Sequence, residues 1–217
     1  MSDFAAARQN MVQSQLEPNG VSADDVAYAM AQIPREQFVP HSLAGVAYLD
    51  KNIEIAPGRF LMEPMVFARL LQAADIGPGD VVLDLGSGSG YSAAVLSKLA
   101  ATVVALESDE TLATQATDTL AELGIDNAAV VAGDCRQGMP DQGPYDAIIF
   151  EGSIAAVPEG FADQLADGGR LVAVIGTGPM GMAMRLVRQH GSVSRQNLFD
   201  AATPPLFGFA EAAGFEF

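Results

Sequence analysis

The sequence has very few of the residues that build disulfides and metal sites. Only one of its 217 residues is cysteine, Cys135, and only two are histidine, His41 and His190. A single cysteine excludes a disulfide within the chain, and two histidines so far apart in sequence do not indicate a metal site, so we expect no metal. A lone cysteine is typical of the reducing cytoplasm, which is the location we expect.

Basic residues and long apolar runs are also scarce. Lys and Arg number 11 against 27 Asp and Glu, which gives a net charge of −16, and no cluster of basic residues occurs. This charge repels phosphate groups, so we expect neither nucleic acid nor an anionic membrane as a partner. No run approaches the roughly 18 apolar residues of a membrane-spanning helix, and no signal peptide is recognisable. We therefore expect a soluble protein.

Apolar residues, in contrast, make up 49% of the chain, which is enough to fill the core of one domain. In the N-terminal part they recur at three- and four-residue steps, and we expect a helical cap there. The predicted helices run over about 4–16, from an N-cap at Ser22 to just before Pro34, and through 67–71. We expect the stretch 51–64 to be irregular because of its prolines and glycine.

From Asp80 onward, short apolar runs alternate with helical patterns. This alternation predicts a doubly wound, mainly parallel sheet covered on both faces. The predicted strands lie at 81–83, 103–106, 128–132, 147–150 and 171–175, and the predicted helices lie at 93–99, 110–123 and 161–165. Alternating residues on both sides of Gly191 predict an antiparallel pair at the sheet edge. We expect 1–217 to form a single α/β domain, with the cap in 1–75 and the core in 76–217.

Three glycines, Gly86, Gly88 and Gly90, join the first predicted strand of this core to the following helix. Glycines at such a turn let the backbone approach a bound ligand closely. The spacing G-x-G-x-G differs from the G-x-G-x-x-G of nicotinamide-binding proteins, because Tyr91 stands where their last glycine would be. The turn therefore disfavours a nicotinamide-dependent oxidoreductase, and Asp84 before it is more typical of methyltransferases that bind S-adenosylmethionine.

Two further acids follow the next two strands. Glu107 comes 21 positions after Gly86, where a carboxylate can accept hydrogen bonds from both ribose hydroxyls. Asp134 follows the third strand, where it could accept from an adenine amino group. The carboxyl ends of parallel strands meet at one edge, so we expect one cofactor site there. Its predicted residues are Asp84, Gly86, Ser87, Gly88, Gly90, Glu107, Ser108, Asp134 and Cys135.

Several motifs along nearly the whole chain resemble the protein-L-isoaspartate O-methyltransferase family. They are Ile33-Pro34-Arg35-Glu36-Gln37-Phe38-Val39-Pro40, Leu83-Asp84-Leu85-Gly86-Ser87-Gly88-Ser89-Gly90-Tyr91, Gly133-Asp134, Pro144-Tyr145-Asp146-Ala147-Ile148-Ile149 and Gly168-Gly169-Arg170-Leu171-Val172. The resemblance implies a class I, Rossmann-like methyltransferase fold and S-adenosyl-L-methionine as cofactor. It also implies methylation of isoaspartyl carboxyls in damaged proteins, with a protein or peptide as substrate.

The acceptor side departs from the family pattern. Where the family has Gly-Gln-Thr-Ile-Ser-Gln-Pro, this chain has Gly58-Arg59-Phe60-Leu61-Met62-Glu63-Pro64, and Glu151 stands in the family's Val-Thr-Ala-Ala segment. The changes remove two hydroxyl donors and add a carboxylate, while Arg59 could restore a donor fork for an anion. The candidate acceptor-pocket residues are therefore Arg59, Phe60, Leu61, Met62 and Glu151.

Three alternatives stay open from these changes. The altered residues could simply pack against the cofactor or the cap, or be solvated. The chain could methylate a different, less anionic or smaller acceptor. It could also be a binding module that holds S-adenosylmethionine without catalysis and works through a partner.

Overall fold

The computed structural model describes residues 3–176, 178 and 180–209, which form a seven-stranded sheet packed against helices. The sheet has the order β5-β4-β3-β6-β7-β8-β9, in which the first five strands are parallel and β8 and β9 are antiparallel. This confirms the mainly parallel sheet with an antiparallel edge. The strands are β3 (Val81–Leu85), β4 (Thr102–Glu107), β5 (Ala128–Ala132), β6 (Tyr145–Ile154), β7 (Leu165–Ile175), β8 (Gly181–Gln189) and β9 (Ser192–Ala201).

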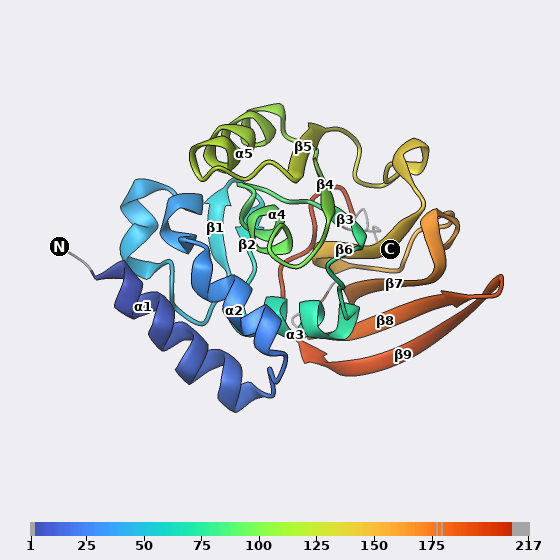
Figure 1. The fold of residues 1–217 in the computed structure, drawn as a ribbon, viewed down its shortest axis with the longest axis horizontal. Helices are drawn as coiled ribbons and strands as arrows, with labels where there is room; N and C mark the ends of the chain where they lie inside the picture. Colours follow the sequence, from blue (N-terminus) through green and yellow to red (C-terminus); the bar gives the residue numbers. More distant parts are fainter. Residues whose placement is uncertain (1–2, 177, 179, 210–217) are drawn as a thin grey trace, which may run out of the picture.

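One face of the sheet is covered by helices (Figure 1). They are α3 (Pro64–Ala74), α4 (Tyr91–Leu96) and α5 (Glu110–Glu122), and α2 (Asp24–Gln32) packs on α3 and α4. The helix α1 (Phe4–Met11) continues through a π-helical stretch, Val12–Leu16, as the pattern over 4–16 predicts. Alternate strand residues such as Val82 and Ile149 join residues of these helices in one apolar cluster. The cap and the sheet therefore share a core.

The opposite face is covered by irregular segments. Leu83 and Phe150 of the sheet pack there with Phe161 and Leu206, which lie in connecting segments. The helix predicted over 161–165 is wrong, because β7 already begins at Leu165 and leaves room only for one 3-10 turn, Ala162–Gln164. This face therefore depends on loops for its cover.

The stretch 51–64, predicted to be irregular, forms a hairpin of β1 (Ile53–Ala56) and β2 (Arg59–Leu61). Its apolar side chains alternate toward the core, with Ile53 and Ile55 at most 9% exposed. Gly58 makes the turn with a φ of +68°, and Pro64 begins α3. The breakers thus mark the turn and a helix start, while the alternating pattern between them builds strands.

The N-cap predicted at Ser22 is also wrong. Helix α2 begins at Asp24, and Ala23 precedes it without a side-chain cap. The Ser22 backbone N–H donates instead to Gln72 Oε1 of α3 at 2.7 Å. Gln72 of α3 therefore accepts a backbone hydrogen bond at the start of α2, where a local side-chain cap was expected. None of the helices in the described ranges has the length and apolar character needed to cross a membrane.

Candidate active site

The glycine turn after β3 has a backbone that only glycine adopts easily. Gly86, Gly88 and Gly90 have φ values of +79°, +55° and +91°. A Cβ at Gly86 would lie 2.2 Å from Leu206 Cδ1, and one at Gly90 would lie 2.9 Å from Ala116 Cβ of α5. The turn is therefore held between α5 and the segment that follows β9. The backbone conformation favours glycine at all three positions, and at Gly90 the fixed Cβ of Ala116 leaves no space for a side chain either.

Glu107 ends β4 and is tied directly to this turn. Its side chain is 1% exposed. Oε2 accepts from the Gly88 N–H at 2.9 Å, and Oε1 accepts from the Asp109 N–H at 2.9 Å. The carboxylate is thus fixed at the carboxyl end of the sheet beside the glycine turn, as the strand spacing predicts.

Arg59, the first residue of β2, is the third partner of Glu107. Its Nε donates to Glu107 Oε1 at 3.1 Å, and its Nη2 donates to Ser108 Oγ at 3.1 Å. The guanidinium carbon lies 3.6 Å from the centre of the Phe207 ring. Arg59 was predicted to line the acceptor pocket. The structure shows that it binds Glu107, which was predicted to bind the cofactor.

Two acidic residues, Asp84 and Glu151, lie close to each other behind the turn. Asp84 is fully buried, and its Oδ2 accepts from Ser92 Oγ at 2.6 Å. Burial raises the pKa of Asp84 to about 7, although the Ser92 hydroxyl opposes the shift. Burial and the charge of Asp84 raise the pKa of Glu151 well above its usual value, and the Arg35 guanidinium opposes that shift. The charge of Asp84 therefore opposes ionisation of Glu151, while the like charge that opposes ionisation of Asp84 is that of Glu107.

Buried polar atoms around this pair lack hydrogen-bond partners among the described residues. Leaving such an atom unpaired costs about 1–3 kcal/mol, so a cluster of them suits a polar or charged ligand group. The atoms are Asp84 Oδ1, Ser87 Oγ, Glu151 Oε1 and Ser153 Oγ.

Arg35 lies beside this cluster, and neither Arg35 nor Ser153 was among the predicted site residues. Arg35 is the charged one. It is fully buried, and it donates to the Ala47 carbonyl at 2.8 Å and to the Met62 carbonyl at 2.6 Å. Its guanidinium carbon lies 4.7 Å from the centre of the Tyr91 ring. No local signal marks Arg35 as buried, because arginine is almost never fully buried unless it is paired, and its partners, the Ala47 and Met62 carbonyls, lie 12 and 27 positions away in sequence.

Asp134 and Cys135 line a separate cleft of about 420 Å³ together with Ser108, Arg136 and Phe207. The Arg136 side chain donates to both carboxylate oxygens of Asp134, at 3.0 and 2.9 Å, and these bonds lower the pKa of Asp134 to about 2. Burial raises the pKa of Cys135 to about 12, so its thiol stays protonated and is a poor nucleophile.

The acceptor-pocket candidates separate into two groups. Arg59, Phe60 and Glu151 line one narrow cleft with the glycine turn and the segment 204–207. Leu61 and Met62 are 6% and 3% exposed and lie in the apolar core. The structure therefore brings three of the five candidates together beside the predicted cofactor residues.

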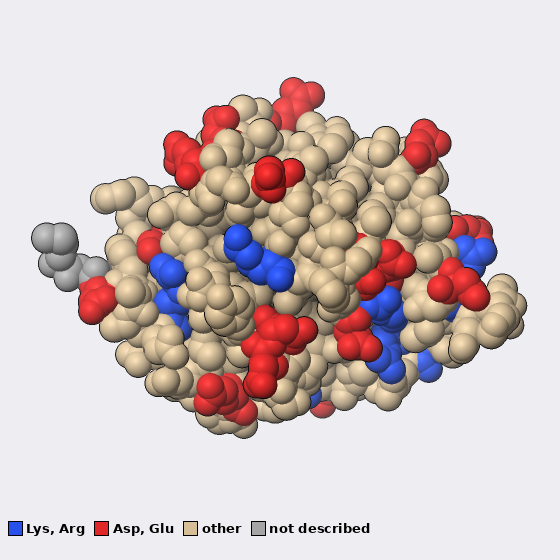
Figure 2. All heavy atoms as spheres, viewed as in Figure 1, with Lys and Arg blue, Asp and Glu red and all other residues tan. Residues whose placement is uncertain are grey.

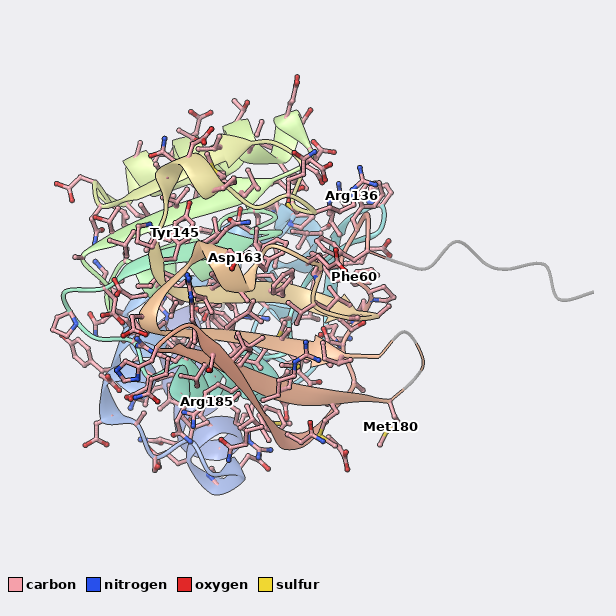
Figure 3. The ribbon with its side chains drawn as sticks, turned by 90° about the vertical axis from the view of Figure 1, so that its right-hand side faces the viewer. Phe60, Arg136, Tyr145, Asp163, Met180 and Arg185 are labelled. Carbon is pink, nitrogen blue, oxygen red and sulfur yellow. The ribbon has the colours of Figure 1, made fainter. Side chains whose placement is uncertain are left out.

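The two clefts lie toward the same edge of the molecule. In Figure 3, Phe60 and Arg136 lie on the same side as Met180, which follows the carboxyl end of β7, while Tyr145 at the start of β6 lies toward the other side.

Figure 2 shows acidic side chains spread over one face among uncharged residues, with basic ones in fewer places. Part of the acidic excess behind the net charge of −16 therefore lies on this face.

Comparisons with known proteins agree with this geometry. A model of the protein-L-isoaspartate(D-aspartate) O-methyltransferase family matches residues 7–207. The chain is 39% identical over 209 residues to the protein-L-isoaspartate O-methyltransferase of Koribacter versatilis, which covers 96% of this chain and 94% of that one. It is 44% identical over 176 residues to the enzyme of that name from Synechococcus sp., with coverages of 81% and 72%.

Solved structures agree as well. A structure named protein-L-isoaspartate O-methyltransferase superposes with a TM-score of 0.80 and 26% identity, covering 94% of this chain and 67% of that one. A Plasmodium falciparum structure has the same fold, with a TM-score of 0.79 and 23% identity over 95% of this chain and 99% of that one. The chain belongs to the protein-L-isoaspartate(D-aspartate) O-methyltransferase family.

Proposed function

We propose that this chain is an S-adenosylmethionine-dependent O-methyltransferase that methylates isoaspartyl carboxyls in damaged proteins or peptides. The observation that carries the proposal is the direct bond between the glycine turn and Glu107 in a chain of this family, with Asp84 buried behind the turn. A carboxylate fixed at that place suits a ribose diol.

The residues present fit the cofactor. When bound, S-adenosylmethionine supplies an electrophilic methyl group on a positively charged sulfur. The unpartnered oxygens of Asp84 and Glu151 offer hydrogen-bond acceptors to the cationic groups of this ligand, and a cation bound there would lower the raised pKa values of both carboxyls. Glu107 would hold the ribose, and the cleft beside Asp134 and Cys135 would hold the adenine. A fold of this kind holds S-adenosyl-L-homocysteine in the Plasmodium falciparum protein.

The chain's part in methyl transfer is to position the acceptor and to exclude water. A carboxylate acceptor is already a nucleophile and needs hydrogen-bond donors rather than a strong base. Arg59 and Phe60 line the narrow cleft beside the turn, and because its volume is only about 10 Å³, the cleft has to widen before they can bind and enclose such an acceptor. Neither the buried thiol of Cys135 nor a histidine is needed for this step.

The proposal includes one domain over 1–217, with the cap and acceptor loop in 1–75 and the cofactor-binding core in 76–217. It is supported by the apolar cluster that joins Met11 and Leu16 of the cap to Val82 and Val172 of the sheet. A cytoplasmic location is also part of the proposal, and the single buried cysteine supports it.

A second candidate function is methylation of a different, less anionic acceptor. Glu151 favours it, because this carboxyl lines the same narrow cleft as Arg59 and Phe60 and would repel an anion when ionised. A cofactor-binding module without catalysis is the third candidate.

Two measurements separate these functions. Calorimetry with S-adenosylmethionine tests the shared cofactor site, and no heat of binding at millimolar ligand would contradict all three. Transfer of a radiolabelled methyl group to an isoaspartyl peptide then tests the acceptor. Binding without transfer would reject the isoaspartyl activity and leave the second and third functions. Glu159→Gln serves as a control, because Glu159 is an exposed carboxylate outside the site, and its removal should change neither cofactor binding nor methyl transfer.

A further inference from the structure

Arg59 occupies the carboxylate that the proposed function assigns to the ribose. We propose that Arg59 is an exchange residue that couples the cofactor to the acceptor. It holds Glu107 through the contact at 3.1 Å, releases it when the ribose binds, and then binds the acceptor carboxylate. This inference rests on the proposed function.

The hydrogen bonds of Glu107 limit what else it can bind. Oε1 accepts from Arg59 Nε at 3.1 Å, from the Asp109 N–H at 2.9 Å and from Ser108 Oγ at 3.4 Å, and Oε2 accepts from the Gly88 N–H at 2.9 Å. A carboxylate has about four acceptor positions, and a ribose diol needs two of them. The diol therefore has to displace donors from Glu107.

Arg59 is the charged donor that can leave most easily. The N–H groups of Gly88 and Asp109 are fixed by the glycine turn and by the start of α5, where Asp109 is the N-cap. The Arg59 head is carried on a flexible stem, and its other contacts are the Ser108 hydroxyl and the face of Phe207. Phe207 is 54% exposed, so the arginine lies between the buried carboxylate and the surface.

The released guanidinium would lie at the acceptor side of the site. Arg59 already lines the narrow cleft with Phe60, Glu151 and Leu206, and release of its head from Glu107 would have to widen this cleft of about 10 Å³ to admit an acceptor carboxylate. A guanidinium matches a carboxylate with two parallel N–H bonds, so the same fork can serve Glu107 in one state and an anionic acceptor in the other. Stacking on Phe207 can keep the guanidinium plane in place through the exchange.

This exchange makes a thermodynamic prediction. Cofactor binding pays for breaking the Arg59 to Glu107 pair, and acceptor binding gains from the released fork. The two ligands therefore bind with positive coupling, and the coupling is reciprocal. A residue that merely supports the fold would change both affinities without changing the coupling.

The experiment compares wild-type protein with Arg59→Gln and Arg59→Lys. Calorimetry measures binding of an isoaspartyl peptide with and without saturating S-adenosyl-L-homocysteine, which transfers no methyl group, and binding of S-adenosylmethionine alone. Arg69→Gln is the matched control, because Arg69 also lies 3.6 Å from a phenylalanine ring, that of Phe199, away from the site. Circular dichroism checks that each variant is folded.

In wild-type protein we expect S-adenosyl-L-homocysteine to tighten peptide binding by about fivefold or more, and Arg69→Gln to keep this coupling. Arg59→Gln should bind S-adenosylmethionine several-fold more tightly, lose the coupling and show a peptide KM raised about tenfold at little changed kcat. Arg59→Lys keeps the positive charge but cannot donate two parallel N–H bonds. Its cofactor affinity, its coupling and its peptide KM should therefore lie between those of wild type and Arg59→Gln.

Other outcomes overturn the inference. It is wrong if Arg59→Gln weakens cofactor binding, or if the coupling survives in this variant. If Arg59→Gln does not fold, the coupling in Arg59→Lys decides, and an unchanged value there refutes the exchange. Failure of the wild-type protein to bind S-adenosylmethionine or to methylate the peptide contradicts the proposed function itself, so the two failures are distinguishable.

Discussion

Removal of the Glu107 carboxylate should destabilise the protein severely, beyond any loss of ligand binding. In Glu107→Ala, the guanidinium of Arg59, which is 9% exposed, loses its only ion-pair partner among the described residues. Breaking a buried ion pair from one side costs about 3–5 kcal/mol. The N–H groups of Gly88 and Asp109 lose their acceptor as well. At about 2–4 °C per kcal/mol for a chain of this length, the melting temperature should fall by roughly 10–15 °C.

A double-mutant cycle tests this reasoning. We expect Glu107→Ala with Arg59→Ala to be more stable than the sum of the two single changes predicts, by about 2 kcal/mol in urea unfolding, because the second change removes the unpaired charge. Arg136→Ala is the control, since the Arg136 to Asp134 pair is exposed and such pairs contribute about 0–1 kcal/mol. A coupling energy below about 0.5 kcal/mol between Glu107 and Arg59 would refute the buried pair in solution.

Three other changes have defined outcomes. The pKa of Asp84 is about 7 in the folded protein against roughly 3.9 in the unfolded chain, so the free energy of unfolding falls as the pH rises between these values. In urea unfolding, the stability of Asp84→Asn relative to wild type should therefore increase from pH 5 to pH 8. A stability difference between the two proteins that does not change with pH would contradict this. Gly90→Ala, with φ of +91° and a contact at 2.9 Å, should cost about 1–3 kcal/mol, more than Gly124→Ala, where φ is +67° and the space is open; equal thermal shifts would reject the steric part. Met62→Ser should lower the free energy of unfolding by about 2–4 kcal/mol, because Met62 is 3% exposed. Phe60 is only half-buried, so Phe60→Thr should lower it clearly less. The reverse order of melting temperatures in calorimetry would mean that Met62 is not in the core.

The sequence allowed the sheet and the cofactor side to be predicted because both depend on local patterns. Short apolar runs separated by helical stretches determine a parallel sheet, and its strand ends then bring Asp84, Glu107 and the glycine turn together. Each of the three glycines has a positive φ, so the spacing of the motif corresponds to a backbone requirement. The position of Glu107 beside Gly88 follows from the same register.

The acceptor side could not be predicted in this way, because its contacts join segments far apart in sequence. Arg59 meets Glu107 across 48 positions, and Arg35 meets Met62 across 27. The hairpin around Gly58 was missed because its strands are only four and three residues long, too short for a clear alternation. Met62 stands at a serine position of the family motif, yet it packs in the core, which only the burial of its side chain reveals.

Methylation of isoaspartyl carboxyls by this chain can be measured directly. The most direct test is the transfer of tritiated methyl groups from S-adenosylmethionine to two peptides that differ only in one isoaspartyl or aspartyl residue. We expect transfer to the isoaspartyl peptide, saturable in peptide, and none above background to its aspartyl twin. Equal transfer to both peptides, or no transfer by protein that binds the cofactor, would contradict this expectation.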